Sequence, residues 1–129
     1  VSGVNDVVDQ VPSHRAVAHR DALANHLRNA CGAWHVVFAP LPPVERFPAL
    51  PQPVRWSAGA DALRHGDALA RWAATRRDVS APRFGLDLHR GVMARDGFHP
   101  GVPAYRQVAG ELARHIAADV WPTYPGDSR

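Results

Sequence analysis

Two groups of polar residues in this 129-residue chain carry side chains that could do chemistry. The first is Gly3-Val4-Asn5-Asp6, and the second is Asp96-Gly97-Phe98-His99-Pro100. Histidine has an ordinary pKa of about 6.5, so it can accept and return a proton near neutral pH. An asparagine amide is an uncharged donor that can bind developing negative charge. These residue types suit a reaction with proton transfer and a negatively charged intermediate.

The elements that must position these residues alternate along the chain. Residues 13–30, 57–77 and 103–120 have the apolar spacing of helices. The short apolar segments 33–39 and 83–88 are predicted as strands, and the Pro-rich segment 41–53 as a long loop. This alternation indicates an α/β fold with a parallel sheet. Because ligands bind at the carboxyl ends of such strands, the two polar groups are expected to share one crevice.

The predicted sheet is unusually small. Only two complete strands are visible, and the chain begins as though at the carboxyl end of a third. A parallel sheet of that size would leave its faces and edges uncovered. We therefore expect residues 1–120 to be the C-terminal part of a single larger domain, with residues 121–129 as a loosely held tail.

The two polar groups, in this order and each after a predicted strand, resemble the SGNH, or GDSL-type, serine hydrolases. That family carries a Gly-x-Asn-Asp block after a central strand and an Asp-x-x-His block just before its last helix. The continuation from His99 to Tyr105 is also similar, although Ala104 stands where glycine is commoner. The resemblance covers residues 1 to about 118. It implies a three-layer α/β/α sandwich with a parallel, flavodoxin-like sheet, N-terminally truncated in this chain.

The resemblance also implies a serine ester hydrolase of the esterase or lipase type. His99 would be the general base, Asp96 would orient it, and the Asn5 amide would donate to the oxyanion. Gly3 would let the backbone turn tightly beside the substrate. The implied substrate is a small-molecule or lipid ester, and the reaction needs no metal and no organic cofactor.

Apolar residues of the Pro-rich loop and its exit are candidates for the substrate pocket, with packing over the sheet as the alternative. They are Phe47, Leu50 and Trp56.

The family's nucleophile is the serine of a Gly-Asp-Ser block near the N-terminus, which this chain lacks. Gly126-Asp127-Ser128 occurs at the other end, where no predicted strand or helix supports it, and we interpret it as a coincidence. The nucleophile is therefore expected upstream of Val1. The 129 residues by themselves are expected to be inactive.

Two other classes of function stay open. The chain could be a non-catalytic binding domain, or an inactive fragment, whose sheet edge pairs with another chain. It could also be a basic module that binds anions. All fifteen basic residues are Arg and the net charge is +3, but they are scattered rather than clustered, so nucleic acid is not expected as a partner.

Several further features are expected to be absent. No apolar run is long enough to span a membrane. The seven histidines other than His99 show no clean metal-ligand pair and are expected at the surface. Oligomeric state and compartment are left open.

Overall fold

The computed structural model of the chain describes residues 3–126. Its main elements, in chain order, are α1 (Val4–Val8), α2 (Ser13–Cys31), β1 (Val36–Val37), α3 (Val54–Ala73), β2 (Val79–Ser80) and α4 (Val102–His115). Three shorter helical turns are η1 (Val44–Arg46), η2 (Ile116–Val120) and η3 (Trp121–Thr123). The structure is mostly helical, at 56%.

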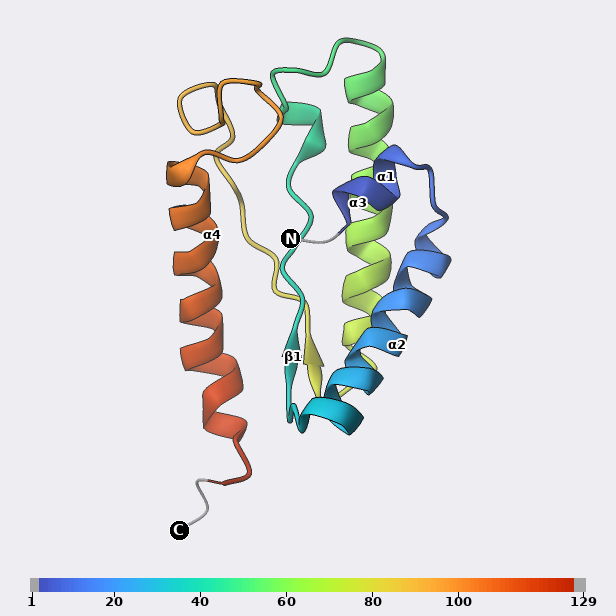
Figure 1. Cartoon of the computed structure of the whole chain (residues 1–129), viewed down its shortest axis with the longest axis vertical. Helices are drawn as coiled ribbons and strands as arrows, with labels where there is room; N and C mark the ends of the chain where they lie inside the picture. Colours follow the sequence, from blue (N-terminus) through green and yellow to red (C-terminus); the bar gives the residue numbers. More distant parts are fainter. Residues whose placement is uncertain (1–2, 127–129) are drawn as a thin grey trace.

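The predicted three-layer α/β/α sandwich is wrong. Within residues 3–126 the sheet consists of β1 and β2 alone, paired in parallel with Val36 opposite Val79 and Val37 opposite Ser80. Helices lie on both sides of this pair, α4 on one side and α2 with α3 on the other (Figure 1). Two strands of two residues each are a ladder between helices and do not form a layer.

Backbone hydrogen bonding explains why the strands are so short. Each strand is followed within three residues by a proline, Pro40 after β1 and Pro82 after β2, and proline has no N–H to continue a ladder. The predicted strand 83–88 pairs with no strand among residues 3–126. Its Leu86 and Leu88 are buried in the core, and the N–H of Asp87 donates to the side chain of Gln107 on α4. This segment is therefore held by side chains and not by a sheet.

The helix predictions do better because helical hydrogen bonds are local. The helix expected over 13–30 is confirmed as α2, which ends at Gly32 in the left-handed conformation. The second helix begins earlier and ends earlier than expected, at Val54–Ala73. The third begins at Val102 as expected, and η2 extends it to Val120 as one π turn.

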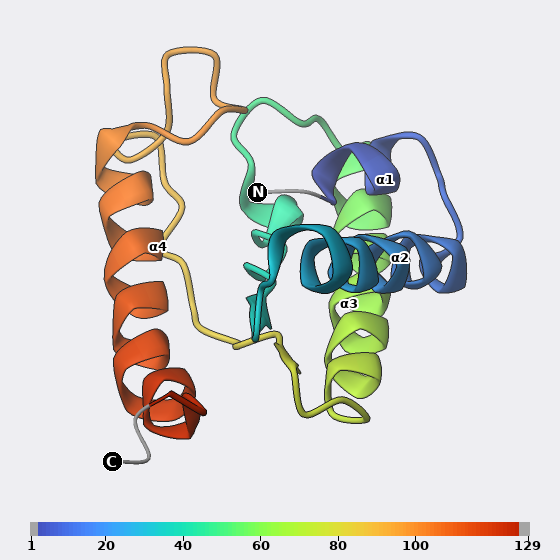
Figure 2. The ribbon, with the colours of Figure 1, turned by 60° about the horizontal axis from the view of Figure 1, so that its bottom comes forward.

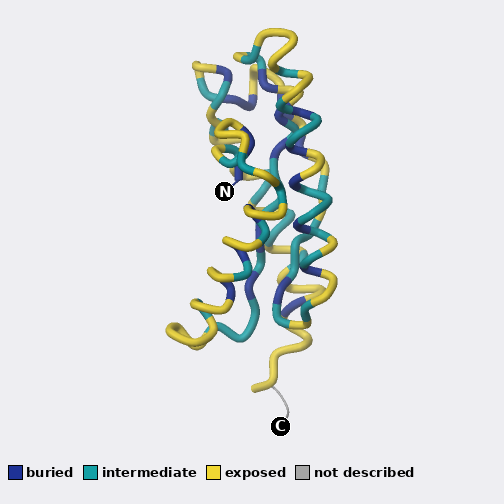
Figure 3. The backbone as a smooth tube through the Cα atoms, turned by 90° about the vertical axis from the view of Figure 1, so that its right-hand side faces the viewer, coloured by how far each residue is buried: buried dark blue, intermediate teal, exposed yellow. Residues whose placement is uncertain are grey.

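The core has two parts. Figure 3 shows buried and exposed residues alternating along the helices, as expected for helices with one face toward a core. The smaller lies between the strands and helices α2 and α3, and contains Ala24, Val36, Phe38, Leu69, Ala73 and Val79. Since side chains alternate along a strand, His35, Val37 and Ser80 lie on the opposite face, toward α4.

The larger part is built around η1, whose Val44 and neighbouring Phe47 are almost fully buried. Around them pack Val7 of α1, Ala62 of α3, Ala104 of α4 and the irregular segment 86–93. Helix α3 approaches η1 closely at Gly59, where an added Cβ would lie 2.6 Å from the Cβ of Glu45.

None of the helices within residues 3–126 is long and apolar enough to cross a membrane.

After α4, the ring of Trp121 stacks on Tyr124, and Tyr124 contacts Trp34 next to β1 with ring centroids 5.2 Å apart. Asp127 and Ser128 of the Gly-Asp-Ser triplet lie outside the described residues.

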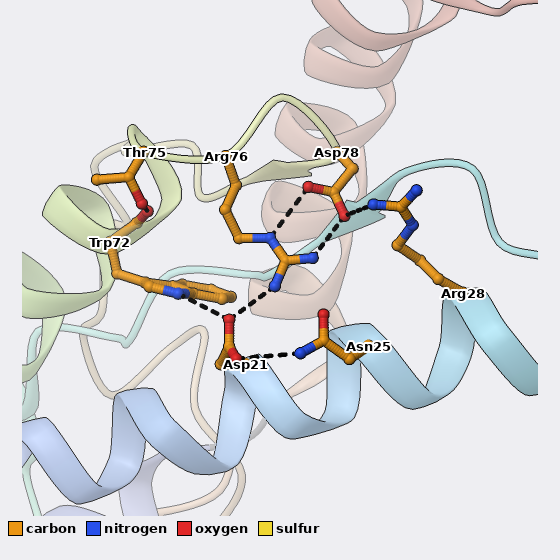
Figure 4. A network of polar contacts seen from close by, with 7 residues as sticks. All are labelled: Asp21, Asn25, Arg28, Trp72, Thr75, Arg76 and Asp78. Atoms are coloured by element: carbon orange, nitrogen blue, oxygen red, sulfur yellow. Dashed lines mark hydrogen bonds and ion pairs between the residues drawn. The ribbon is translucent and has the colours of Figure 1, made fainter.

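Ion pairs around Arg76 join α2 to the end of α3 and the start of β2 (Figure 4). The Arg76 guanidinium donates to Asp21 on α2 at 2.6 Å and to both carboxylate oxygens of Asp78 at 3.0 and 2.6 Å. Arg28 donates to Asp78 at 2.5 Å, and the indole of Trp72 donates to Asp21. The hydrogen bonds from the two arginines, Arg76 first, hold the pKa of Asp78 well below its ordinary value.

We expect Asp78→Asn to lower the free energy of unfolding at pH 7 by about 2 kcal/mol, because charge-assisted hydrogen bonds are lost in a largely buried place. The pKa of Asp78 is depressed in the folded state. Its contribution is therefore fully present above the unfolded pKa of about 3.9 and declines as pH falls below it. Urea unfolding at pH 7 and pH 3 should show a difference from wild type that shrinks at the lower pH. The exposed Asp9→Asn is the control, and an equal loss in both variants would contradict the prediction.

Candidate functional site

The Asp96–His99 segment lies in a closed hairpin that leads into α4 (Figure 2). The N–H of Gly101 donates to the carbonyl of Val92 at 2.9 Å, and the N–H of Ala94 donates to the carbonyl of His99 at 2.8 Å. Gly97 makes the turn with φ +68° and lies against Ala49, so this position needs a glycine. The hairpin thus fixes the backbone on both sides of His99.

Within this hairpin the structure brings Asp96 and His99 into direct contact. His99 Nδ1 lies 2.5 Å from Asp96 Oδ2, and Asp96 Oδ1 accepts the N–H groups of Phe98 and His99 at 2.9 and 3.0 Å. The hydrogen bond from His99, followed by those two amides, lowers the pKa of Asp96 to about 2. Since the ionised carboxylate only accepts, Nδ1 carries the proton, and Nε2 of a neutral His99 is a proton acceptor.

The imidazole of His99 is accessible, with 71% of its side chain exposed. The ring of Phe98 contacts it edge-on at 5.4 Å, and Phe98 contacts the buried Phe47 in the same manner. Phe98 therefore links one face of the His99 ring to the hydrophobic core. Among residues 3–126, Nε2 has no hydrogen-bond partner, so it is free to meet a substrate.

Asn5 does not join this pair. It is exposed on α1, and no hydrogen bond in the described part of the chain connects its side chain to Asp96 or His99. Helix α1 packs on α3, whereas the hairpin meets the start of α4, and Figures 1 and 2 both draw the two apart. The single crevice expected for both polar groups is absent from residues 3–126.

Gly3 has a clear structural role. It is buried with φ +124°, and an added Cβ would lie 2.6 Å from Nη2 of Arg20 and 3.2 Å from the side chain of Leu41. Arg20 is itself buried, donates to the carbonyl of Ala16 and pairs with Asp6 at 3.3 Å. Glycine is therefore needed at this position for the backbone to pass a buried guanidinium.

The three candidate pocket residues do not meet in one cavity. Phe47 is buried in the core, Leu50 packs against it partly buried, and Trp56 is 72% exposed on α3. An apolar cavity of about 210 Å³ lies instead between residues 40–43, α3 and residues 81–84. A hollow of about 470 Å³ adjoins Asp96 and is lined also by Arg90 and Arg95, but His99 does not line it.

Three of the seven other histidines are not surface residues, contrary to expectation. His65 is buried and donates from Nε2 to the carbonyl of Val11 at 2.9 Å. His35 and His115 are partly buried and both contact the hydroxyl of Ser80. No group of three or more His, Cys, Asp or Glu side chains within residues 3–126 could hold a metal ion. The sequence signal that could have identified His115 is its i,i+4 spacing to Asp119 on a predicted helix.

Comparison with protein families, with curated proteins and with solved structures finds no match to this chain. The family resemblance therefore stays a prediction from the two residue blocks.

We expect a carbon-detected NMR titration to give a pKa of about 2 for the Asp96 carboxyl. In His99→Ala the pKa should rise toward the ordinary 3.9 without reaching it, because the two backbone N–H donors remain. His89→Ala, which changes an exposed histidine that contacts Asp87, should leave the pKa of Asp96 at its wild-type value. An Asp96 pKa that is the same in wild type and His99→Ala would show that the 2.5 Å contact is not formed in solution.

Proposed function

We propose that this chain provides the acid–base pair of a serine ester hydrolase. The observation that supports the proposal is the 2.5 Å contact between His99 Nδ1 and Asp96 Oδ2, which leaves Nε2 exposed. A histidine held by a carboxylate on one ring nitrogen and open on the other has the arrangement of the general base in a Ser-His-Asp triad.

In this proposal the nucleophilic serine comes from a segment outside the 129 residues. His99 Nε2 takes the proton of the serine hydroxyl as its oxygen attacks the ester carbonyl, and then returns that proton to the leaving alcohol. Water enters by the reverse of these steps and releases the acid. Asp96 keeps Nδ1 protonated and stabilises the imidazolium that forms in each half of the reaction.

Asn5 is the proposed donor to the oxyanion, and the support for it is its exposed side chain in the Gly-x-Asn-Asp block. The donor must lie within hydrogen-bond distance of the oxyanion, so the proposal requires the segment that carries the serine to bridge α1 and the hairpin. Phe98, partly buried beside His99, provides apolar surface for a small-molecule or lipid ester.

The test is hydrolysis of p-nitrophenyl acetate by the native protein that contains this chain. His99→Ala should lower kcat by roughly a millionfold, since the nucleophile and its base act as one unit. Asp96→Asn should lower kcat by about 10⁴-fold, because an amide at that position no longer selects the Nδ1–H tautomer.

His89→Ala is the matched control, since His89 is exposed and lies just before the same hairpin. It should keep the wild-type kcat. If His99→Ala also keeps it, His99 is not the base. Hydrolysis that survives every change at Asp96 and His99 would leave the chain as a binding domain or place the chemistry elsewhere.

A further inference from the structure

A second histidine–carboxylate pair lies at the C-terminal end of α4, and this pair has a serine in contact with it. Ser80 is the last residue of β2, on the strand face turned toward α4. Its Oγ lies 2.8 Å from Nε2 of His115, and Nδ1 of His115 lies 2.9 Å from Oδ2 of Asp119. On the other side, Oγ lies 3.1 Å from Nε2 of His35.

With both histidines neutral, the chemistry of the four groups gives one arrangement of protons in this chain of hydrogen bonds. Asp119 only accepts, so His115 carries its proton on Nδ1 and donates it to the carboxylate. Nε2 of neutral His115 is then an acceptor, and Ser80 donates its hydroxyl proton to it. The serine oxygen keeps lone pairs free, and His35 donates its Nε2–H to one of them.

Burial favours the same arrangement. Removal from water lowers the pKa of His35 and outweighs the opposing effect of the nearby Asp78 carboxylate, so His35 stays neutral near pH 7. His115 is largely enclosed, with 16% of its side chain exposed, whereas Asp119 is 67% exposed. The central imidazole is therefore positioned by packing, and the carboxylate reaches it from the surface.

From this geometry we propose that Ser80 is an activated nucleophile, with His115 as its general base and Asp119 as the positioning carboxylate. The site accepts an acyl or phosphonyl group from a small electrophilic ester. It goes beyond the proposed function because it uses neither His99 nor a serine from outside the chain.

A hollow in the surface lies beside the His115–Asp119 pair. It has a volume of about 420 Å³, and His115 and Asp119 line it together with Pro82, Phe84 and two ion-paired arginines, Arg83 and Arg114. This volume is within the range of small-molecule sites. Ser80 is partly buried and does not line this hollow, although its Oγ contacts His115, which does, so the site is limited to small acyl groups.

The covalent step is a single transfer. The oxygen of Ser80 forms a bond to the carbonyl carbon while its proton passes to Nε2 of His115. The bond from that carbon to the leaving oxygen then breaks, and the leaving group takes the proton from His115. The products are acyl-Ser80 and a free alcohol, with His115 neutral again.

The two histidine sites are well separated. His99 precedes α4 and His115 is its last residue, so the helix alone separates them by roughly 20 Å. In Figure 1 the hairpin meets one end of α4 and the strands lie beside the other half. A change at one site is therefore not expected to alter chemistry at the other.

The experiment is labelling of the 129-residue chain by a small, untagged fluorophosphonate, followed by mass spectrometry of the peptides. We expect the label on Ser80, and we expect Ser80→Ala to abolish it. His115→Ala should slow labelling by about a hundredfold or more, the usual contribution of a general base. Asp119→Asn should also slow it, and because Asp119 is exposed this variant is expected to fold, which circular dichroism checks.

Two control variants test whether labelling depends on the Ser80 site. Ser57 is exposed on α3 and should stay unlabelled, so Ser57→Ala should not change the rate. His89→Ala, which changes an exposed histidine outside both sites, should label at the wild-type rate. No label on Ser80, equal labelling of Ser57, or a rate unaffected by both His115→Ala and Asp119→Asn would each overturn the proposal and leave the four residues as a structural link between β2 and α4.

Discussion

The ion pairs of Arg76 are the interaction on which the rest of the structure depends. A sheet of two residues per strand cannot fix its own position, because it has too few backbone hydrogen bonds. Arg76 fixes it instead by holding Asp21 on α2 and Asp78 just before β2. The carbonyl of Asp78 accepts the N–H of Val36, so Asp78 also takes part in the hydrogen bonding between the two strands. Ser80 follows Asp78 by two residues. The ion pairs of Arg76 with Asp78 therefore also fix where Ser80 lies beside α4.

The sequence predicted features that depend on contacts between nearby residues, and it failed for features that depend on contacts between distant ones. Helix α2 and the start of α4 were predictable because apolar spacing, a glycine stop and a proline start are local signals. The sheet was not predictable, since residues 83–88 have the composition of a strand but pair with no other strand within residues 3–126. Their apolar side chains still reach the core through Leu86 and Leu88. The composition of residues 83–88 thus predicted that the segment is buried, but it did not predict which group accepts its backbone hydrogen bond.

The same difference between nearby and distant contacts applies to the residues of the candidate site. Asp96 meets His99 because the two are three positions apart in a tight hairpin, and the turn itself makes the contact. Asn5 was assigned through the family's three-layer fold, which the structure does not have, and within residues 3–126 no hydrogen bond joins its side chain to Asp96 or His99. The candidate pocket residues likewise do not meet in one cavity. Gly3 illustrates the risk, because the glycine attributed to a substrate is explained by Arg20 and Leu41. A residue type alone does not distinguish a close ligand from a close side chain.

Both histidine–carboxylate pairs are local, one across a turn and the other across one turn of helix. Such pairs form readily and by themselves do no chemistry, since each needs a hydroxyl at the second ring nitrogen. Packing of β2 against α4 supplies one to His115, over 35 residues of sequence. For His99 the described residues supply none, and its ring is open to solvent. The difference between the two sites is therefore set by tertiary packing, and the half-buried pair has its hydroxyl already in place while the exposed pair must acquire one.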